Sequence, residues 1–221
     1  MERKISFVEG EYYHLYNRGV DKRTIFLSAH DYKRFLVLLY LANSNRDTRV
    51  SNVIRTTKYV DIFTLDRGDP IVAIGAYCLM PNHFHILATP LIENGISQFM
   101  LKFQTGYSMY FNAKNERSGS LFQGPFRSTH AADDRYLRYL YSYIHLNPAK
   151  LQDQQWRERI DSKNVLMRFV EAYPYSSYGA YLNNSHTITD PGEFPDYFSE
   201  KDEVVAHICD WLQTEDVVEQ G

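Results

Sequence analysis

Two histidines one residue apart, His83 and His85, are the side chains whose type and spacing best suit metal chemistry. Successive side chains of a β-strand point to opposite faces, so in a strand both imidazoles would share one face while Phe84 and Ile86 enter the core. Two imidazoles at this spacing can hold one divalent ion and leave positions for a further ligand and a substrate oxygen. The same pattern is also typical of surface or hydrogen-bonded histidines, so the spacing alone does not establish a metal site.

A tyrosine-rich segment, residues 133–148, supplies a second chemical group. Leu137 and Ile144 recur at helical spacing and would pack inward, while Tyr143 and Asn147 lie one turn apart on an adjacent stripe. Such a helix would present a phenol and a carboxamide oxygen side by side to a metal held by the histidines. Phenols keep their proton up to about pH 10, so a phenol nucleophile needs a metal or a base beside it. Taken alone, the segment is better explained as an ordinary amphipathic helix.

The elements that must position these groups follow from hydrophobic periodicity and turn signals. Strands are predicted at residues 11–18, 71–79 and 83–89, with an extended segment at 121–129. Helices are predicted at residues 30–43, 97–111 and 133–147, and the polar segment 44–58 is predicted to be a loop. This order indicates an α+β fold, a ferredoxin-like or RRM-like antiparallel sheet with helices packed on one face, followed by a C-terminal helical extension.

Three regions are predicted along the chain. Residues 8–150 form the domain that carries the histidines and the tyrosine, and residues 151–186 form a helical extension packed on it. Helices are expected at residues 163–172 and shortly after Tyr173. Residues 187–221 form an acidic tail, in which residues 204–212 have the pattern of one more amphipathic helix.

Charge is distributed unevenly, although the net charge is only −3. The tail carries ten acids and one lysine, which leaves residues 1–186 with a net charge of +6. A basic body is compatible with a nucleic-acid partner, and the tail would then either shield that surface or serve as a solubilising extension. The basic side chains that we predict to contact DNA are Arg18, Lys22, Arg23, Lys102, Arg117, Arg127, Arg135 and Arg138.

Cysteine content and hydropathy restrict the compartment. Cys78 and Cys209 lie far apart, so neither a disulfide scaffold nor a thiolate metal site is indicated. The N-terminal residues lack the apolar stretch of a signal peptide, and no apolar run is long enough to span a bilayer. We expect a cytoplasmic protein that does not engage a membrane.

Five segments together resemble a known family. In order along the chain they are YYHLYNRGVDKRTIF from Tyr12, MPNHFHIL from Met80, GSLFQGPF from Gly119, DDRYLRYLYSYIHLNP from Asp133 and YPYSSYGAYL from Tyr173. Their order and content are similar to the REP-associated tyrosine transposases, a group of the HUH single-tyrosine transposase superfamily found in bacterial insertion sequences. The resemblance covers approximately residues 10–182.

The resemblance implies a complete chemical scheme. His83 and His85 would correspond to the metal ligands, Tyr143 to the nucleophile and Asn147 to a third ligand, with Mg²⁺ or Mn²⁺ as the ion. The substrate would be single-stranded or hairpin DNA, cleaved and rejoined through a 5'-phosphotyrosine, and no nucleotide cofactor would be required. Some relatives exchange the tyrosine helix between subunits; the long extension here favours a monomer over a homodimer.

Three alternatives remain open at this point. The chain could be a non-catalytic DNA-binding module on the same scaffold, or a metal-dependent phosphoesterase that uses water in place of the tyrosine. It could also be a domesticated relative with a host role unrelated to DNA mobility.

Overall fold

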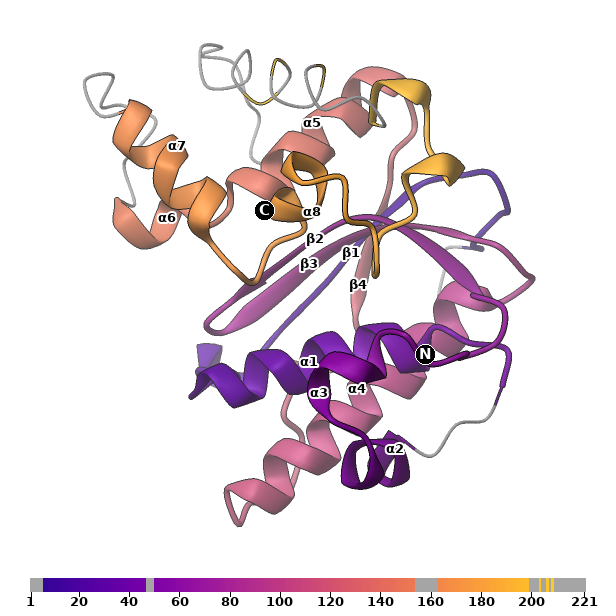
Figure 1. Ribbon diagram of the computed structural model, residues 1–221, viewed down its shortest axis with the longest axis vertical. Helices are drawn as coiled ribbons and strands as arrows, with labels where there is room; N and C mark the ends of the chain where they lie inside the picture. The colour runs from indigo at the N-terminus through magenta and orange to yellow at the C-terminus, as the bar shows by residue number, and fades with distance from the viewer. Residues whose placement is uncertain are drawn as a thin grey trace.

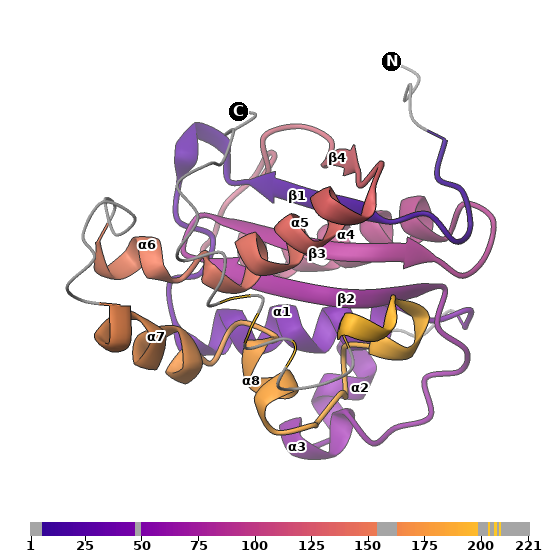
Figure 2. The same ribbon diagram turned by 90° about the horizontal axis from the view of Figure 1, so that it is seen from above.

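A four-stranded antiparallel sheet forms the centre of the computed structural model (Figure 1). Its strands are β1 (Tyr13–Arg18), β2 (Val72–Met80), β3 (His83–Pro90) and β4 (Arg127–His130), arranged in the order β2-β3-β1-β4 (Figure 2). With one long helix between β1 and β2 and another between β3 and β4, this is the ferredoxin-like topology. The predicted fold class is therefore confirmed. The structure describes residues 6–46, 50–153 and 163–198, together with residues 203, 206 and 208.

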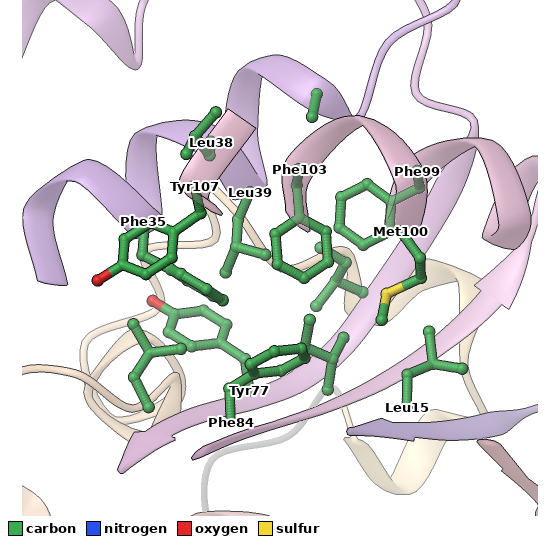
Figure 3. Packing of buried hydrophobic residues seen from close by; sticks show 14 of the residues in the cluster. Leu15, Phe35, Leu38, Leu39, Tyr77, Phe84, Phe99, Met100, Phe103 and Tyr107 are labelled. Atoms are coloured by element: carbon green, nitrogen blue, oxygen red, sulfur yellow. The ribbon is translucent and has the colours of Figure 1, made fainter. Parts of the chain in front are cut away.

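Helices α1 (Ala29–Ala42) and α4 (Gly95–Lys114) cover one face of the sheet. Alternation along β3 sends Phe84 and Ile86 to this face, where they are fully buried. Phe84 packs against Phe35 of α1 and Phe103 of α4, with ring centroids 5.2 and 5.4 Å apart (Figure 3). This apolar layer fixes the orientation of β3 and so sends its histidines to the opposite face.

Helix α5 (Asp134–Leu146) covers the opposite face, packed on β2 and β3. All nine residues of β2 are buried, so this strand requires apolar cover on both sides. The prediction that helices pack on one face describes α1 and α4 correctly, but α5 makes the sheet the middle of three layers. Leu137, Leu140 and Ile144 face inward from α5, as their spacing predicts.

The C-terminal extension contains α6 (Ala149–Gln152), α7 (Lys163–Ala172), α8 (Tyr178–Leu182) and the 3₁₀ turns η4 (Pro191–Glu193) and η5 (Asp196–Phe198). Before α8, the chain runs along the free edge of β2. Leu79 N donates to the Tyr175 carbonyl at 2.9 Å, and Ser177 N donates to the Tyr77 carbonyl at 2.9 Å. The edge of β2 is therefore capped by the chain itself.

Several element boundaries differ from the sequence predictions. Two helices, α2 (Val50–Thr56) and α3 (Tyr59–Ile62), follow α1, and α2 lies inside the predicted loop. The predicted extended segment at 121–129 contributes only the short β4, and a 3₁₀ turn η1 (Val20–Lys22) follows β1. Most of the predicted helix at 204–212 lies outside the described residues. Within the described part of the chain, no helix combines the length and apolarity needed to cross a membrane.

Candidate active site

The two histidines of β3 lie on the face that α5 covers. Antiparallel pairing places Arg18 of β1 opposite His83, and Tyr16 opposite His85. Tyr16 in turn pairs with Arg127 of β4. Because paired residues share a face, both arginines start from the same surface of the sheet as the histidines.

Each of these histidines has one ring nitrogen engaged with a neighbouring side chain. His85 Nδ1 lies 2.9 Å from Nε2 of His14, a buried histidine on β1. His83 Nδ1 lies 2.6 Å from Oδ1 of Asn82, in the turn that joins β2 to β3. The imidazoles of His83 and His85 stand nearly perpendicular, with centroids 5.0 Å apart.

All three imidazoles are held in the neutral form. Burial lowers the pKa of His14 to about 3. Burial, assisted by the positive charges of Arg18 and Lys150, lowers the pKa of His83 to about 4. The pKa of His85 lies well below its ordinary value because of burial and its histidine neighbours. A neutral imidazole is the form that binds a metal ion.

Helix α5 brings Tyr143 to the histidines within one chain. The helix begins at an Asp133 N-cap, whose side chain accepts from Tyr136 N at 2.8 Å. About two to three turns later, the Tyr143 ring meets His85 edge-on, with centroids 5.4 Å apart, and meets His14 at 6.1 Å. The phenol predicted from the helix pattern and the predicted metal ligands are therefore neighbours.

Asn147 follows the last turn of α5 and supplies a carboxamide. Its Nδ2 donates to the Tyr143 carbonyl at 3.2 Å, while its Oδ1 is buried with no hydrogen-bond partner among the described residues. His85 Nε2 is orphaned in the same way. Buried polar atoms normally find partners, so these two atoms fit ligands of an ion.

The donor types, two imidazoles and one amide oxygen, are compatible with a divalent ion. Among the described residues, no three His, Cys, Asp or Glu side chains are grouped closely enough to bind one metal. A site at the two histidines therefore needs a ligand of another type, and the Asn147 oxygen is of that kind. A carboxamide oxygen suits Mg²⁺ and Mn²⁺, whereas imidazole suits Zn²⁺, Fe²⁺, Ni²⁺ and Cu²⁺, and the absence of a thiolate from the set disfavours soft metals.

The predicted DNA contacts fall into separate regions. Arg18 and Arg127 are exposed beside the histidines, and Lys22 and Arg23 lie in and next to the η1 turn that follows Arg18. Arg135 and Arg138 lie on α5, where Arg138 donates to Asp134 at 2.9 Å. The remaining two predicted contacts belong to the α4 side of the sheet: Lys102 donates to the Ser44 carbonyl at 3.1 Å, and Arg117 donates to Asn112 at 2.6 Å.

Two residues near this site, His14 and Lys150, were not predicted from the sequence. His14 alternates with Tyr12 and Tyr16 on one face of β1, so the strand pattern could have placed it beside an HxH pair. Lys150 follows the turn at Pro148, and its ammonium lies 5.0 Å from the centre of the Tyr143 ring. No local sequence pattern predicts that Lys150 belongs to the site, because its position depends on the path of the chain after α5.

Comparison with known proteins adds a family to this geometry. A family model described as "Transposase IS200 like" matches residues 40–147. A solved structure, a REP-associated tyrosine transposase bound to a REP hairpin, is similar with a TM-score of 0.50 and 15% sequence identity, covering 88% of each chain. At this identity the likeness concerns the fold. No curated protein matches the sequence.

Proposed function

We propose that this chain is a metal-dependent enzyme that cleaves and rejoins single-stranded DNA beside a hairpin, because residues 40–147 match the family model of IS200-like transposases. The observation that carries the proposal is the contact of Tyr143 with His85, whose buried Nε2 has no hydrogen-bond partner in the described part of the chain. A DNA-binding module without catalysis would not need a phenol at this position.

His83, His85 and Asn147 would hold the ion, either Mg²⁺ or Mn²⁺. When bound, it would polarise a phosphate oxygen and stabilise the charge that develops there. Tyr143 Oη attacks the phosphorus and gives its proton to solvent, while the bond from phosphorus to the 3'-oxygen breaks and this oxygen takes up a proton from solvent. The products are a 5'-phosphotyrosine and a protonated 3'-hydroxyl. Attack by another 3'-hydroxyl reverses these steps and releases the tyrosine, so no nucleotide cofactor is needed.

Lys150 contributes positive charge next to the nucleophile. Its ammonium lies over the Tyr143 ring, and it adds to the field that lowers the pKa of His83. A cation at this position would stabilise the negative charge that develops on the attacked phosphate. Lys150 therefore joins the proposed site as an electrostatic contributor.

The DNA partner is proposed to be a single strand flanked by a hairpin, because the similar transposase was solved with a REP hairpin. Arg18 and Arg127 flank the histidines and would contact phosphates there. We propose that the protein acts as a monomer, because α5 brings Tyr143 against His85 of its own chain.

The test is to incubate the chain with labelled single-stranded hairpin DNA and Mn²⁺, then look for an adduct that survives denaturation. We expect an adduct from the wild type and none from Tyr143→Phe or His83→Ala. Tyr139→Phe is the matched control, because Tyr139 stacks on Tyr143 at 5.8 Å, one turn earlier on α5.

Two outcomes would contradict the proposal. An adduct that persists in Tyr143→Phe would remove the nucleophile assignment. Cleavage without any adduct would favour the water-using phosphoesterase, whereas hairpin binding without cleavage would favour the non-catalytic module.

A further inference from the structure

The contact between His14 and His85 limits where the protons on these rings can lie. His14 Nε2 and His85 Nδ1 are 2.9 Å apart, and the two side chains are only 7% and 6% exposed. The rings are almost parallel, at 24°. Two neutral imidazoles joined in this way share one proton, so one ring donates and the other accepts.

The two arrangements differ in what they leave at His85 Nε2. If His14 donates, His85 carries its proton on Nε2, where it can neither ligate an ion nor find a hydrogen-bond acceptor among the described residues. If His85 donates from Nδ1, its Nε2 presents a lone pair, which is the form of a metal ligand. Only in the second arrangement can the unpartnered Nε2 of His85 bind a metal ion.

His83 shows the same arrangement without ambiguity. Asn82 Nδ2 donates to the Lys22 carbonyl at 3.1 Å, which turns Asn82 Oδ1 toward His83. An amide oxygen only accepts, so His83 must donate from Nδ1 and keep the lone pair on Nε2. The turn residue Asn82 thus fixes the neutral form of one histidine.

We propose that His14 is the corresponding positioning residue for His85: it accepts the Nδ1 proton and holds Nε2 ready to bind the metal. The proposal rests on the proposed function, because it concerns the same metal site. In metal sites, such outer partners orient the ligating ring and fix its tautomer. The two histidines would then be set by acceptors from different parts of the fold, β1 for His85 and the β2–β3 turn for His83.

The first test reads the tautomers directly in the metal-free, DNA-free full chain. Long-range ¹H–¹⁵N NMR correlations of the histidine rings distinguish Nδ1–H from Nε2–H. We expect the Nδ1–H form for His14, His83 and His85 alike. An Nε2–H form of His85 would overturn the inference, whatever the chain does with DNA.

The second test measures Mn²⁺ affinity by calorimetry, with thermal melting to check that each variant is folded. His14→Phe removes the acceptor and is expected to weaken Mn²⁺ binding about 10- to 100-fold. His14→Gln restores an acceptor oxygen near the place of Nε2 and is expected to recover most of the affinity. Tyr16→Phe is the control on the same face of β1, and we expect wild-type affinity from it.

The failures are distinguishable. Equal losses in His14→Phe and His14→Gln would make His14 a direct ligand or a purely structural residue and overturn the inference, as would unchanged affinity in His14→Phe. Absence of Mn²⁺ binding in the wild type would overturn the proposed function and this inference with it. If His14→Phe does not fold, the NMR measurement of the wild-type tautomers still tests the inference.

Discussion

Buried polar groups, Asp31 on one face of the sheet and His85 and Asn147 on the other, differ in how fully they are hydrogen-bonded. On the α1–α4 side, Asp31 is completely buried, yet its carboxylate accepts from Leu27 N, Ser28 N and Ser28 Oγ, from Tyr110 and from Lys114. On the α5 side, His85 Nε2 and Asn147 Oδ1 are buried without hydrogen-bond partners in the described part of the chain.

We interpret the difference as one between a polar group that stabilises the fold and polar atoms that would bind the proposed metal ion. Burial alone would raise the pKa of Asp31, but hydrogen bonds from Lys114, Tyr110 and Ser28 lower it. That carboxylate has hydrogen bonds to both of its oxygens, and those from Tyr110 and Lys114 connect α1 to α4. The orphaned atoms on the other side destabilise the free protein and stabilise only a complex that completes them. Variants on the two faces should therefore separate stability from activity.

The largest effect is expected from Asn147→Leu. Leucine keeps the approximate shape of asparagine but offers no oxygen, so adduct formation should fall about 100-fold or more, as loss of a metal ligand implies. The free energy of unfolding without metal should fall by only about 1 kcal/mol, because leucine loses the Nδ2 bond to the Tyr143 carbonyl, while Oδ1 has no hydrogen-bond partner among the described residues. Gel quantification of adduct and a urea melt measure both quantities. A large loss of stability with normal adduct formation would show that Asn147 stabilises the fold and does not bind the metal.

Asp31→Asn should show the opposite behaviour. Removing a buried, multiply bonded charge should lower the free energy of unfolding by about 3 kcal/mol. Mn²⁺ affinity at a temperature where the variant is folded should remain that of the wild type. Chemical denaturation and calorimetry give the two values, and a weakened Mn²⁺ site would show that the faces are coupled.

Acid should weaken the α5 side first. Burial lowers the pKa of His145 to about 3, so below the ordinary histidine pKa of about 6.5 the unfolded chain takes up a proton that the folded chain refuses. Stability is therefore lost as the pH falls from 6.5 toward 3, by about 1.4 kcal/mol per pH unit for each such histidine.

His145→Gln removes one titrating group while keeping an amide near Ser177 Oγ, which lies 2.7 Å from His145 Nε2. Urea melts at pH 6, 5 and 4 should show a slope shallower by about 1.4 kcal/mol per pH unit. An unchanged slope would mean that His145 is protonated in the folded protein. Asp31, whose pKa is already lowered, should not contribute over this range.

The smallest effects are expected from surface cations. Arg18→Ala and Arg127→Ala should each weaken hairpin binding severalfold and reduce the slope of log affinity against log salt by about 0.7 to 0.9. Lys102→Ala, on the far side of the sheet, should leave that slope unchanged. Fluorescence anisotropy across a salt series measures all three. Equal slopes for Arg18→Ala and Lys102→Ala would place the DNA elsewhere.

Sequence periodicity predicted the elements whose apolar stripe is long. It found β1, α1, β2, β3 and α5, but not α2, where Val50, Val53 and Ile54 give too short a stripe within polar neighbours. β4 begins later than predicted because Gly124, with φ of 75°, and Pro125 interrupt the extended run.

The residues of the proposed site also fall into two groups, those that the sequence pattern predicts and those that it does not. His83 and His85 are recognisable because their relation is local, and Tyr143 and Asn147 share one helix. His14 and Lys150 come from segments 69 residues before His83 and seven residues beyond Tyr143, and only the tertiary fold brings them in. The position of a side chain that is set by strand pairing, or by the path of the chain after a helix, cannot be predicted from sequence periodicity.

Ser177 bears on how small a working fragment can be. Its backbone and hydroxyl bond to Tyr77 on the edge of β2, while the same hydroxyl lies against His145 of α5, two residues from Tyr143. A fragment cut at residue 150 would lose these contacts, expose the β2 edge to intermolecular pairing and weaken the packing of α5, which carries the proposed nucleophile. The boundary predicted near residue 150 is therefore a poor place to trim the protein, and a minimal enzyme must extend through α8.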